Sequence, residues 1–266
     1  MKILKKAVSL VLSAVVVAGL GSVVSAADTN INIKSTFPDK NFQAFLKKYD
    51  TDNNGYLYYS ELMKIKSISV DSSAGIEDFT GIEYLKYTRQ LIVFGGDAEE
   101  IDLSNCYNIS DCKILGTPCL RSFKAGPYLD SLEISLCDGI KTLDLSKAYD
   151  LEEFKLVYNR KLKQDIDLSA TRFLKTVEIY DTPITSVKFN ALAQIDDLIV
   201  AGTKITSINL TNMDFNRSIY CYVYDNPNLT SICMPKNSFT ILQMNRTKDG
   251  SYKYSDSKSD KRIYIA

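Results

Sequence analysis

The chain repeats itself with a period of about 22 residues, and this repeat limits the possible folds more than any other feature. One signature is an apolar-x-apolar triplet followed by a small residue, as in Ile101-Asp-Leu103-Ser104. Its seven copies begin 20 to 24 residues apart, at Ile101, Phe123, Leu143, Ile166, Val187, Ile208 and Ile232. A second signature, L-x-x-L-x-L, keeps the same period from Leu129, Leu151, Leu174 and Ile195, with a weaker copy at Ile219 and Cys221.

Each unit of such a repeat supplies a strand that can bury its apolar face only against the units above and below it. The period and the L-x-x-L-x-L pattern are typical of leucine-rich repeats. We therefore predict an α+β protein in which residues 67–240 form a leucine-rich-repeat β-solenoid. A β-sandwich, the alternative for alternating apolar residues, would give irregular spacing.

Composition removes several kinds of enzyme. The chain has 266 residues, 45% of them hydrophobic, and no histidine. Ser-His-Asp and Cys-His catalysis, histidine general bases and histidine-ligated zinc sites are therefore excluded. None of the six cysteines forms a C-x-x-C pair, which also argues against zinc.

Residues 1–26 are typical of a secretory signal peptide. Lys2, Lys5 and Lys6 precede an apolar run of about 14 residues, and small residues follow at 24–26. A membrane-spanning helix would need about 20 apolar residues. Cleavage would leave 29 basic and 32 acidic side chains, a balance that gives no reason to expect nucleic acid or anionic lipid as a partner. We expect a secreted, extracellular protein without membrane insertion.

A calcium loop is predicted at residues 50–61, within a cap that covers residues 36–66. Oxygen ligands stand at loop positions 1, 3, 5 and 12, and Gly55 at position 6 allows the sharp turn that a cation-binding loop needs. The predicted Ca²⁺ ligands are Asp50, Asp52, Asn54, the carbonyl of Tyr56, Tyr58 through water, and Glu61. The alternative is an Asp- and Asn-rich turn without metal.

Helical signals flank this loop. Phe42, Phe45, Leu46 and Tyr49 have the spacing of an apolar helix stripe that Pro38 could open, and Leu62 and Ile65 would begin a short exiting helix. The stripe could cover Ile68, Val70 and Ile82 at the open end of the solenoid. Only one such loop occurs in the chain, so we expect a structural clip and not a paired sensor.

The order of these segments resembles secreted bacterial leucine-rich-repeat proteins that carry an N-terminal EF-hand-like cap. The likeness rests on the signal peptide, Phe37-Pro-Asp-Lys-Asn-Phe42, the calcium loop, the stretch from Gly75 to Ile82, and the repeats containing I-D-L-S. It implies an extracellular binding or adhesion role. The chain departs from the pattern in residues 84–128, which are degenerate, and in the repeat asparagine, which we find only at Asn159.

At the other end, residues 241–266 are predicted to be a capping hairpin and a tail. Apolar residues 241–244 and 252–254 would pair across Asp249-Gly250.

The cysteines of the exported part, at 106, 112, 119, 137, 221 and 233, could form disulfides. Since two of them fall on predicted strands, buried free thiols are the favoured interpretation.

Side chains between the buried positions of each strand should form columns across the repeats. One column is predicted to contain Glu133, Lys155, Glu178, Ile199 and Tyr220, and the next Ser135, Val157, Tyr180, Ala201 and Tyr222. Together with Tyr158 and Tyr224 these columns offer an aromatic surface suited to binding. Tyrosine is also simply a good strand residue. The other strand carries a mixed-charge column from Asp102 to Asn209 that would only keep the protein soluble.

Three functions remain open. The favoured one is a monomeric, secreted binding or adhesion protein that recognises a protein or glycan through this tyrosine surface. A second is a non-catalytic component of an extracellular complex, although a single loop argues against a dockerin. An enzyme would need carboxylate pairs such as Glu99 with Glu100 or Asp196 with Asp197, and adjacent residues of a strand point to opposite faces.

Overall fold

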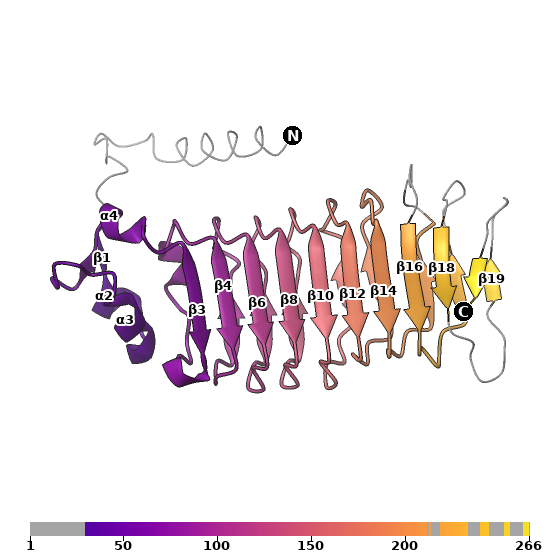
Figure 1. Ribbon diagram of the computed structural model, residues 1–266, viewed down its shortest axis with the longest axis horizontal. Helices are drawn as coiled ribbons and strands as arrows, with labels where there is room; N and C mark the ends of the chain where they lie inside the picture. Colours follow the sequence, from indigo (N-terminus) through magenta and orange to yellow (C-terminus); the bar gives the residue numbers. More distant parts are fainter. Residues whose placement is uncertain are drawn as a thin grey trace.

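Parallel strands stacked in one direction make up most of the molecule (Figure 1). The structure is a computed structural model that describes residues 30–211, 213, 219–233, 240–244, 253–255 and 263–265. The predicted signal peptide lies outside these residues. Because the repeats form successive, similar coils, the prediction of a β-solenoid is confirmed.

One side of the solenoid is a ten-stranded parallel sheet. Its strands are β3 (Ser67–Asp71), β4 (Gln90–Phe94), β6 (Asp111–Leu115), β8 (Ser131–Ser135), β10 (Glu153–Val157), β12 (Thr176–Tyr180), β14 (Asp197–Ala201), β16 (Ile219–Tyr224), β18 (Thr240–Met244) and β20 (Ile263–Ile265). From β3 to β16, aligned residues in neighbouring strands lie 20 to 23 residues apart in the chain. The degenerate stretch 84–128 therefore forms regular coils, in which Cys112 takes a leucine position.

The opposite side consists of shorter parallel strands in three groups. They are β5 (Glu100–Asp102), β7 (Ser122–Lys124) and β9 (Thr142–Asp144), then β11 (Ile166–Leu168) and β13 (Val187–Phe189), then β15 (Ser207–Asn209), β17 (Ser231–Cys233) and β19 (Lys253–Ser255). β9 and β11 do not pair with each other, and the side chain of Gln164 makes hydrogen bonds in place of the missing strand pairing. Its side-chain amide accepts from the N–H of Leu143 at 2.9 Å and donates to the carbonyl of Leu143 at 3.0 Å.

The predicted C-terminal hairpin is wrong. β18 pairs in parallel with β16 and β20, whereas β19 pairs in parallel with β17 on the other side of the solenoid. The two segments that the Asp249-Gly250 pair seemed to join are thus successive strands of one further coil, so the solenoid continues past residue 240.

A single apolar core runs between the two sides and includes the cap. Strand side chains alternate between buried and exposed positions, as in β12, where Val177 and Ile179 are fully buried. Such alternation is what an inward-facing, period-2 pattern produces.

The long strands from β4 to β16 are each followed by a residue with left-handed backbone. Glycine takes this place in three coils, at Gly95, Gly116 and Gly202. Leu136, Tyr158, Asp181 and Asp225 take it in the others, with φ between 43° and 57°. The turn off the sheet therefore imposes the conformation even where the side chain disfavours it.

Buried polar side chains line the next corner of the coil: Thr117, Asn159, Thr182, Thr203 and Asn226. Asn159 Nδ2 donates to the carbonyls of Ile134 and Val157 at 2.8 and 3.1 Å. Asn226 makes the equivalent bonds to Val200 and Tyr224. The inference that only Asn159 keeps the repeat asparagine is therefore wrong, because Asn226 holds the same position.

The N-terminal cap contains β1 (Ile31–Asn32), α2 (Ile33–Thr36), α3 (Lys40–Leu46), β2 (Tyr56–Leu57) and α4 (Tyr59–Leu62). Two single-turn 3₁₀ helices, η1 (Ser72–Ala74) and η2 (Ile82–Tyr84), follow in the first coils. α3 begins at Lys40, after the N-cap Asp39, and thus two residues later than Pro38. The exiting helix α4 ends at Leu62, where we expected it to begin.

Candidate functional site

Three carboxylates converge in the loop between α3 and α4. Asp50, Asp52 and Glu61 each place one oxygen within 4.8 Å of the others, and Asp50 and Glu61 are buried. Gly55 has φ of 83°, as the sharp turn at position 6 requires. This donor set has the chemistry of a hard-cation site.

The other predicted ligands lie beside these three carboxylates. Asn54 donates its side-chain amide to Asp52 at 2.7 Å, and its oxygen accepts from the N–H of Tyr56 at 2.8 Å. The side chains of Tyr56 and Tyr58 are exposed, with ring centroids 6.5 Å apart. The structure thus brings together the ligands at positions 1, 3 and 12, whereas the oxygen of Asn54 is engaged within the loop.

Hydrogen bonds organise Glu61 for this position. Oε1 accepts from the N–H and the hydroxyl of Thr51 at 2.6 and 2.7 Å, and Oε2 accepts from the N–H of Tyr58 at 3.0 Å. Burial alone would raise the pKa of Glu61, but these bonds outweigh it and hold that pKa below its ordinary value. The carboxylate is therefore ionised at neutral pH, the form that binds a cation.

Strand β1 pairs with the loop at residues 56–57. Ile31 and Asn32 pair antiparallel with Leu57 and Tyr56 of β2, and the N–H of Ile33 donates to the carbonyl of Gly55 at 3.0 Å. The loop therefore receives its pairing strand from residues 31–32, which precede the predicted cap of residues 36–66.

Asp39 joins the cap to the solenoid, a role that we did not predict. Oδ1 accepts from the N–H groups of Asn41 and Phe42, and Oδ2 accepts from those of Glu77 and Asp78 in the first coil, at 2.7 to 3.2 Å. Nearby, the ring of Phe42 packs edge-on against Phe37 and Phe79. The only sequence signal for this role was a helix N-cap residue before α3.

The exposed face of the ten-stranded sheet carries three columns of side chains. The first column is Ser67, Gln90, Asp111, Ser131, Glu153, Thr176, Asp197 and Tyr220. The middle column is Ser69, Ile92, Lys113, Glu133, Lys155, Glu178, Ile199 and Tyr222. The end column is Asp71, Phe94, Leu115, Ser135, Val157, Tyr180, Ala201 and Tyr224.

Our placement of the last tyrosines was wrong by two residues. Leu198 and Val200 align with Cys221 and Val223, not with Ile219 and Cys221. Tyr220 therefore belongs to the first column, Tyr222 to the middle column and Tyr224 to the end column. The alignment failed because Cys221 occupies the position that Leu198 holds in the preceding coil, whereas we had aligned Cys221 with Val200.

An aromatic cluster does form at this end of the face. The rings of Tyr180 and Tyr224 lie 6.3 Å apart across the small side chain of Ala201. Burial, together with the neighbouring Tyr224 hydroxyl, raises the pKa of Tyr180 well above its ordinary value. Tyr220 is 44% exposed. Tyr158 lies at the end of β10 in the left-handed turn, with the guanidinium of Arg160 over its ring.

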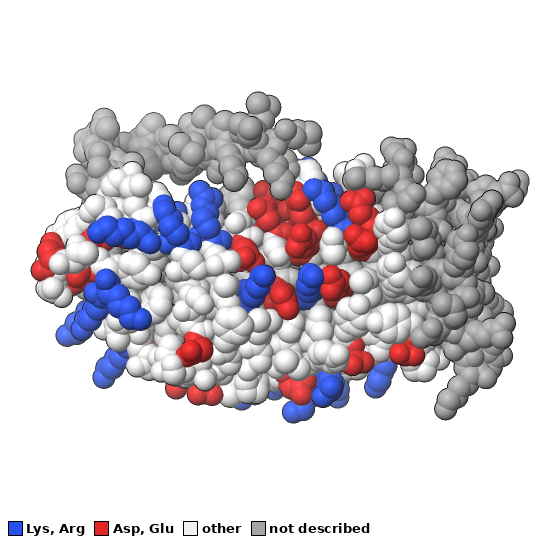
Figure 2. Space-filling view, in the orientation of Figure 1, with Lys and Arg blue, Asp and Glu red and all other residues white. Residues whose placement is uncertain are grey.

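Towards the cap, the middle column is charged. Lys113, Glu133, Lys155 and Glu178 alternate in sign, and Lys155 pairs with Glu178 at 2.8 Å (Figure 2). The opposite side is also charged, since Lys124 bridges Glu100 and Asp102 and Lys188 pairs with Asp167. Aromatic contact area on the long-strand face therefore concentrates in the C-terminal coils.

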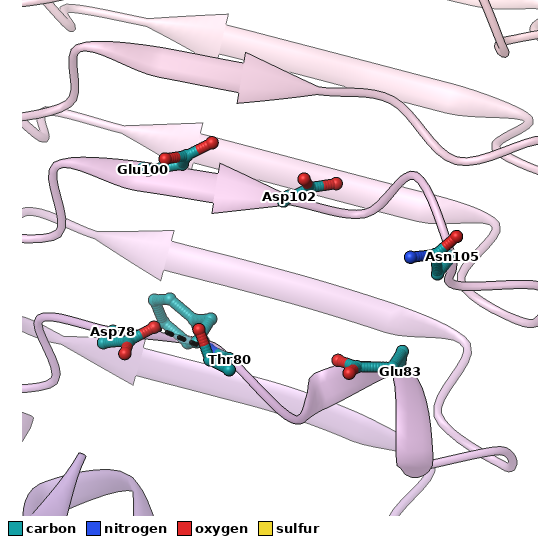
Figure 3. A pocket seen from close by; sticks show the side chains of 7 residues that line it. Asp78, Thr80, Glu83, Glu100, Asp102 and Asn105 are labelled. Atoms are coloured by element: carbon teal, nitrogen blue, oxygen red, sulfur yellow. Dashed lines mark hydrogen bonds between the residues drawn. The ribbon is translucent and has the colours of Figure 1, made fainter. Parts of the chain in front are cut away.

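Two hollows lie on the short-strand side. One, of about 310 Å³, is lined by Asp78, Phe79, Thr80, Glu83, Glu100, Asp102 and Asn105 between the first two coils (Figure 3). The other, of about 620 Å³, lies beside the gap that Gln164 spans. None of the tyrosines predicted to bind a ligand lines either hollow.

Neither proposed carboxylate pair forms an acid-base dyad. Glu99 pairs with Arg121 at 3.2 Å, and Glu100 pairs with Lys124 at 2.8 Å. Asp197 is the first residue of β14 and belongs to the first column, whereas Asp196 lies directly before the strand.

The expected buried thiols are confirmed at four positions. Cys106, Cys112, Cys137 and Cys221 are free and buried, and burial raises the pKa of each thiol, to about 12 for Cys106 and Cys221. Cys119 is also free but half-buried.

Comparison with known proteins gives structural matches only. An internalin (inlF) from Listeria monocytogenes superposes with a TM-score of 0.48 at 18% identity, covering 87% of this chain and 75% of that chain. The functional domain of InlJ from Listeria monocytogenes, described as including a cysteine ladder, gives a TM-score of 0.43 at 19% identity, covering 83% of this chain and 58% of that chain. No protein-family model and no curated protein matches the sequence. Within the described part of the chain, no helix has both the length and the apolar character to span a membrane.

Proposed function

We propose that this protein is an extracellular binding or adhesion protein that recognises a protein or glycan with the C-terminal part of its long-strand face. The observation that carries the proposal is the tyrosine cluster formed by Tyr180 on β12 and by Tyr220, Tyr222 and Tyr224 on β16, two coils further along the same sheet. Tyrosines on a rigid sheet offer large contact area at a small cost in side-chain entropy. Tyr158 extends this surface at its edge.

A comparative binding experiment tests this role. The purified protein would be screened against a glycan array and an extracellular protein array, and each ligand measured again with Tyr180→Ala and Tyr224→Ala. We expect a loss of about 2 kcal/mol or more for a central aromatic contact, which is about 30-fold in affinity. Leu192→Ala removes a side chain that is 72% exposed outside the three columns and should leave binding unchanged.

Two results would contradict this proposal. One is the absence of any ligand whose affinity depends on these tyrosines. The other is a stable association with a larger complex that tolerates both tyrosine substitutions, which would favour the alternative role of a structural component.

We also propose that the loop 50–61 holds one structural Ca²⁺, with Asp50, Asp52 and Glu61 as its charged ligands and Asn54, Tyr56 and Tyr58 completing the shell. The convergent carboxylates and the ionised state of Glu61 support this assignment. An isolated extracellular loop of this type would have a dissociation constant on the order of 10⁻⁴ to 10⁻³ M.

Calorimetric titration with Ca²⁺ tests the site directly. We expect one binding event in the wild type and none in Asp50→Asn or Glu61→Gln. Glu77→Gln, an exposed change outside the loop, serves as the control. Absence of binding, with a melting temperature that chelation does not change, would refute the calcium assignment and leave the tyrosine surface unaffected.

A further inference from the structure

The connections that lead into the long strands carry an unequal distribution of charge. Each of them contains one buried residue that anchors the coil: Ile65, Thr88, Ile109, Leu129, Leu151, Leu174 and Ile195. The residues directly before and after each anchor are exposed or half-buried. Bonds such as those from the N–H of Arg89 to the carbonyl of Lys66 and from the N–H of Glu152 to the carbonyl of Asp130 keep successive connections in register. We call this row the leading edge.

At the cap end, the leading edge is basic. Lys64, Lys66, Lys86 and Arg89 are all exposed. Among the ion pairs between described residues, none involves these four side chains. Lys66 instead lies over the ring of Tyr87, at 5.1 Å from its centroid. Figure 2 shows basic side chains gathered along this part of the edge.

Three coils further along, the same edge is acidic. Asp130, Asp150, Glu152 and Glu153 lie on two adjacent connections, and Glu152 also pairs with Lys175 of the next coil at 2.8 Å. Strand spacing of about 4.8 Å per coil places the centres of the two clusters about 14 Å apart. Figure 2 shows the acidic group over the middle strands.

Exposed aromatic surface lies between the two clusters. Tyr107 is 60% exposed, and its ring centroid lies 6.1 Å from that of Tyr128 on the next coil. An aromatic centre flanked by charged residues is the usual anatomy of a protein interface.

We propose that two copies of this protein pair antiparallel along the leading edge, about a two-fold axis near Tyr107. Because both clusters lie on one edge, this axis brings the basic cluster of each copy onto the acidic cluster of the other. The contact is self-complementary and closed, as an isologous dimer requires. Exposed ion pairs contribute about 0 to 1 kcal/mol each, so the tyrosines supply contact area and the charges set the orientation.

A polyanion is a less suitable occupant of the basic cluster. The acidic cluster lies little more than one Debye length away at about 0.1 M salt, so a long anionic polymer along the edge would meet repulsion. A second copy meets attraction at both ends.

A charge-swap experiment by analytical ultracentrifugation tests the dimer, with the chain lacking residues 1–26. The first variant combines Lys64→Glu, Lys66→Glu, Lys86→Glu and Arg89→Glu, and the second combines Asp130→Lys, Asp150→Lys and Glu153→Lys. We expect the wild type to dimerise more weakly as salt rises from about 50 to about 500 mM. Each variant alone should dimerise at least about tenfold more weakly, and an equimolar mixture of the two should regain the dimer. Regained association also shows that both variants are folded.

The matched control reverses four exposed lysines elsewhere, Lys34, Lys40, Lys47 and Lys163, for the same change in net charge. It should dimerise like the wild type. Wild-type protein that stays monomeric at low salt, assemblies that grow beyond two copies, or a mixture that fails to associate would each overturn the proposal. So would a monomer that binds polyphosphate through the basic cluster, since that cluster would then serve a polyanion.

Discussion

Gly81 lies where the first coil of the solenoid packs tightly against the cap. Its φ is 97°, and a Cβ atom there would lie 2.7 Å from the ring of Phe37 and 2.7 Å from the carbonyl oxygen of Thr36. We predict that Gly81→Ala lowers the free energy of unfolding by about 3 kcal/mol or more, because left-handed backbone strain adds to a clash with immobile atoms. Urea denaturation followed by circular dichroism measures the change.

Gly116→Ala separates the two causes. Gly116 has φ of 63°, and nothing lies within 4 Å of its added Cβ. This variant should therefore lose only the backbone component, about 1 to 2 kcal/mol. Equal losses in the two variants would show that the contact with Phe37 contributes nothing.

The sequence predicts which side chains lie on the strands better than it predicts the column to which each one belongs. The alternation of apolar residues correctly predicted the buried apolar pair of each strand from β8 to β14, but it placed Ser135 and Ala201 in an outward column although both are buried. It failed at β16, because Cys221 and Val223, and not Ile219 and Cys221, fill the leucine positions. It also gave no sign that Leu136 and Tyr158 adopt left-handed backbone, since the turn and not the side chain imposes that conformation.

At the scale of elements, Asp39 connects α3 to the first coil through four backbone donors. Burial alone would raise the pKa of Asp39, but these donors outweigh it and hold that pKa below its ordinary value. We predict that Asp39→Asn costs about 1 to 2 kcal/mol at neutral pH, the usual cost of losing a helix cap and charged hydrogen bonds. Thermal unfolding at pH 7 measures this loss.

The same substitution should flatten the acid limb of the stability curve. A carboxyl group with a lowered folded-state pKa contributes its full stability above its unfolded pKa of about 3.9, and loses it as pH falls through the folded value. Wild type and Asp39→Asn should therefore converge in stability as pH falls below about 3.9 and through the folded-state pKa of Asp39. A difference between them that stays constant down to pH 2 would exclude the carboxylate as the source.

The helices and strands could be predicted where a repeat period or a motif marked them. The contacts between one element and another could not. The loop signature located the turn at Gly55 and the three convergent carboxylates, and the apolar stripe located α3. A spacing rule carries no information about pairing partners. The link from Asp39 to Glu77 and the pairing of β1 with β2 therefore appear only in the fold, and the Asp249-Gly250 pair was misread as a hairpin.

For the whole molecule, net charge concealed the charge pattern that the fold creates. The chain has 32 basic and 32 acidic side chains, a balance that gave no reason to expect nucleic acid or anionic lipid as a partner. Coiling at about 22 residues places Lys64 beside Lys86 and Asp130 beside Glu152, so that each sign gathers on its own part of one edge. The repeat that made the solenoid predictable is also what sorts these charges in space.

Calcium bound in the cap at one end should stabilise the entire solenoid. Neighbouring coils of a solenoid stabilise each other, so a firmly held first coil should protect those behind it. At 10 to 100 times its dissociation constant, Ca²⁺ would contribute about 1.4 to 2.7 kcal/mol to the cap. If Asp39 transmits this gain, Ca²⁺ should raise the melting temperature of the sheets about half as much in Asp39→Asn as in the wild type. Circular dichroism measures this increase, and calorimetry should show that the Ca²⁺ affinity is unchanged. Asp165→Asn removes a carboxylate that accepts from Thr185 and Ser186 far from the cap, and should lower the melting temperature without changing the calcium increment. Equal, positive increments in all three proteins would mean that Asp39 does not transmit the calcium gain. The absence of any increment in the sheets would mean that the cap and the coils unfold independently.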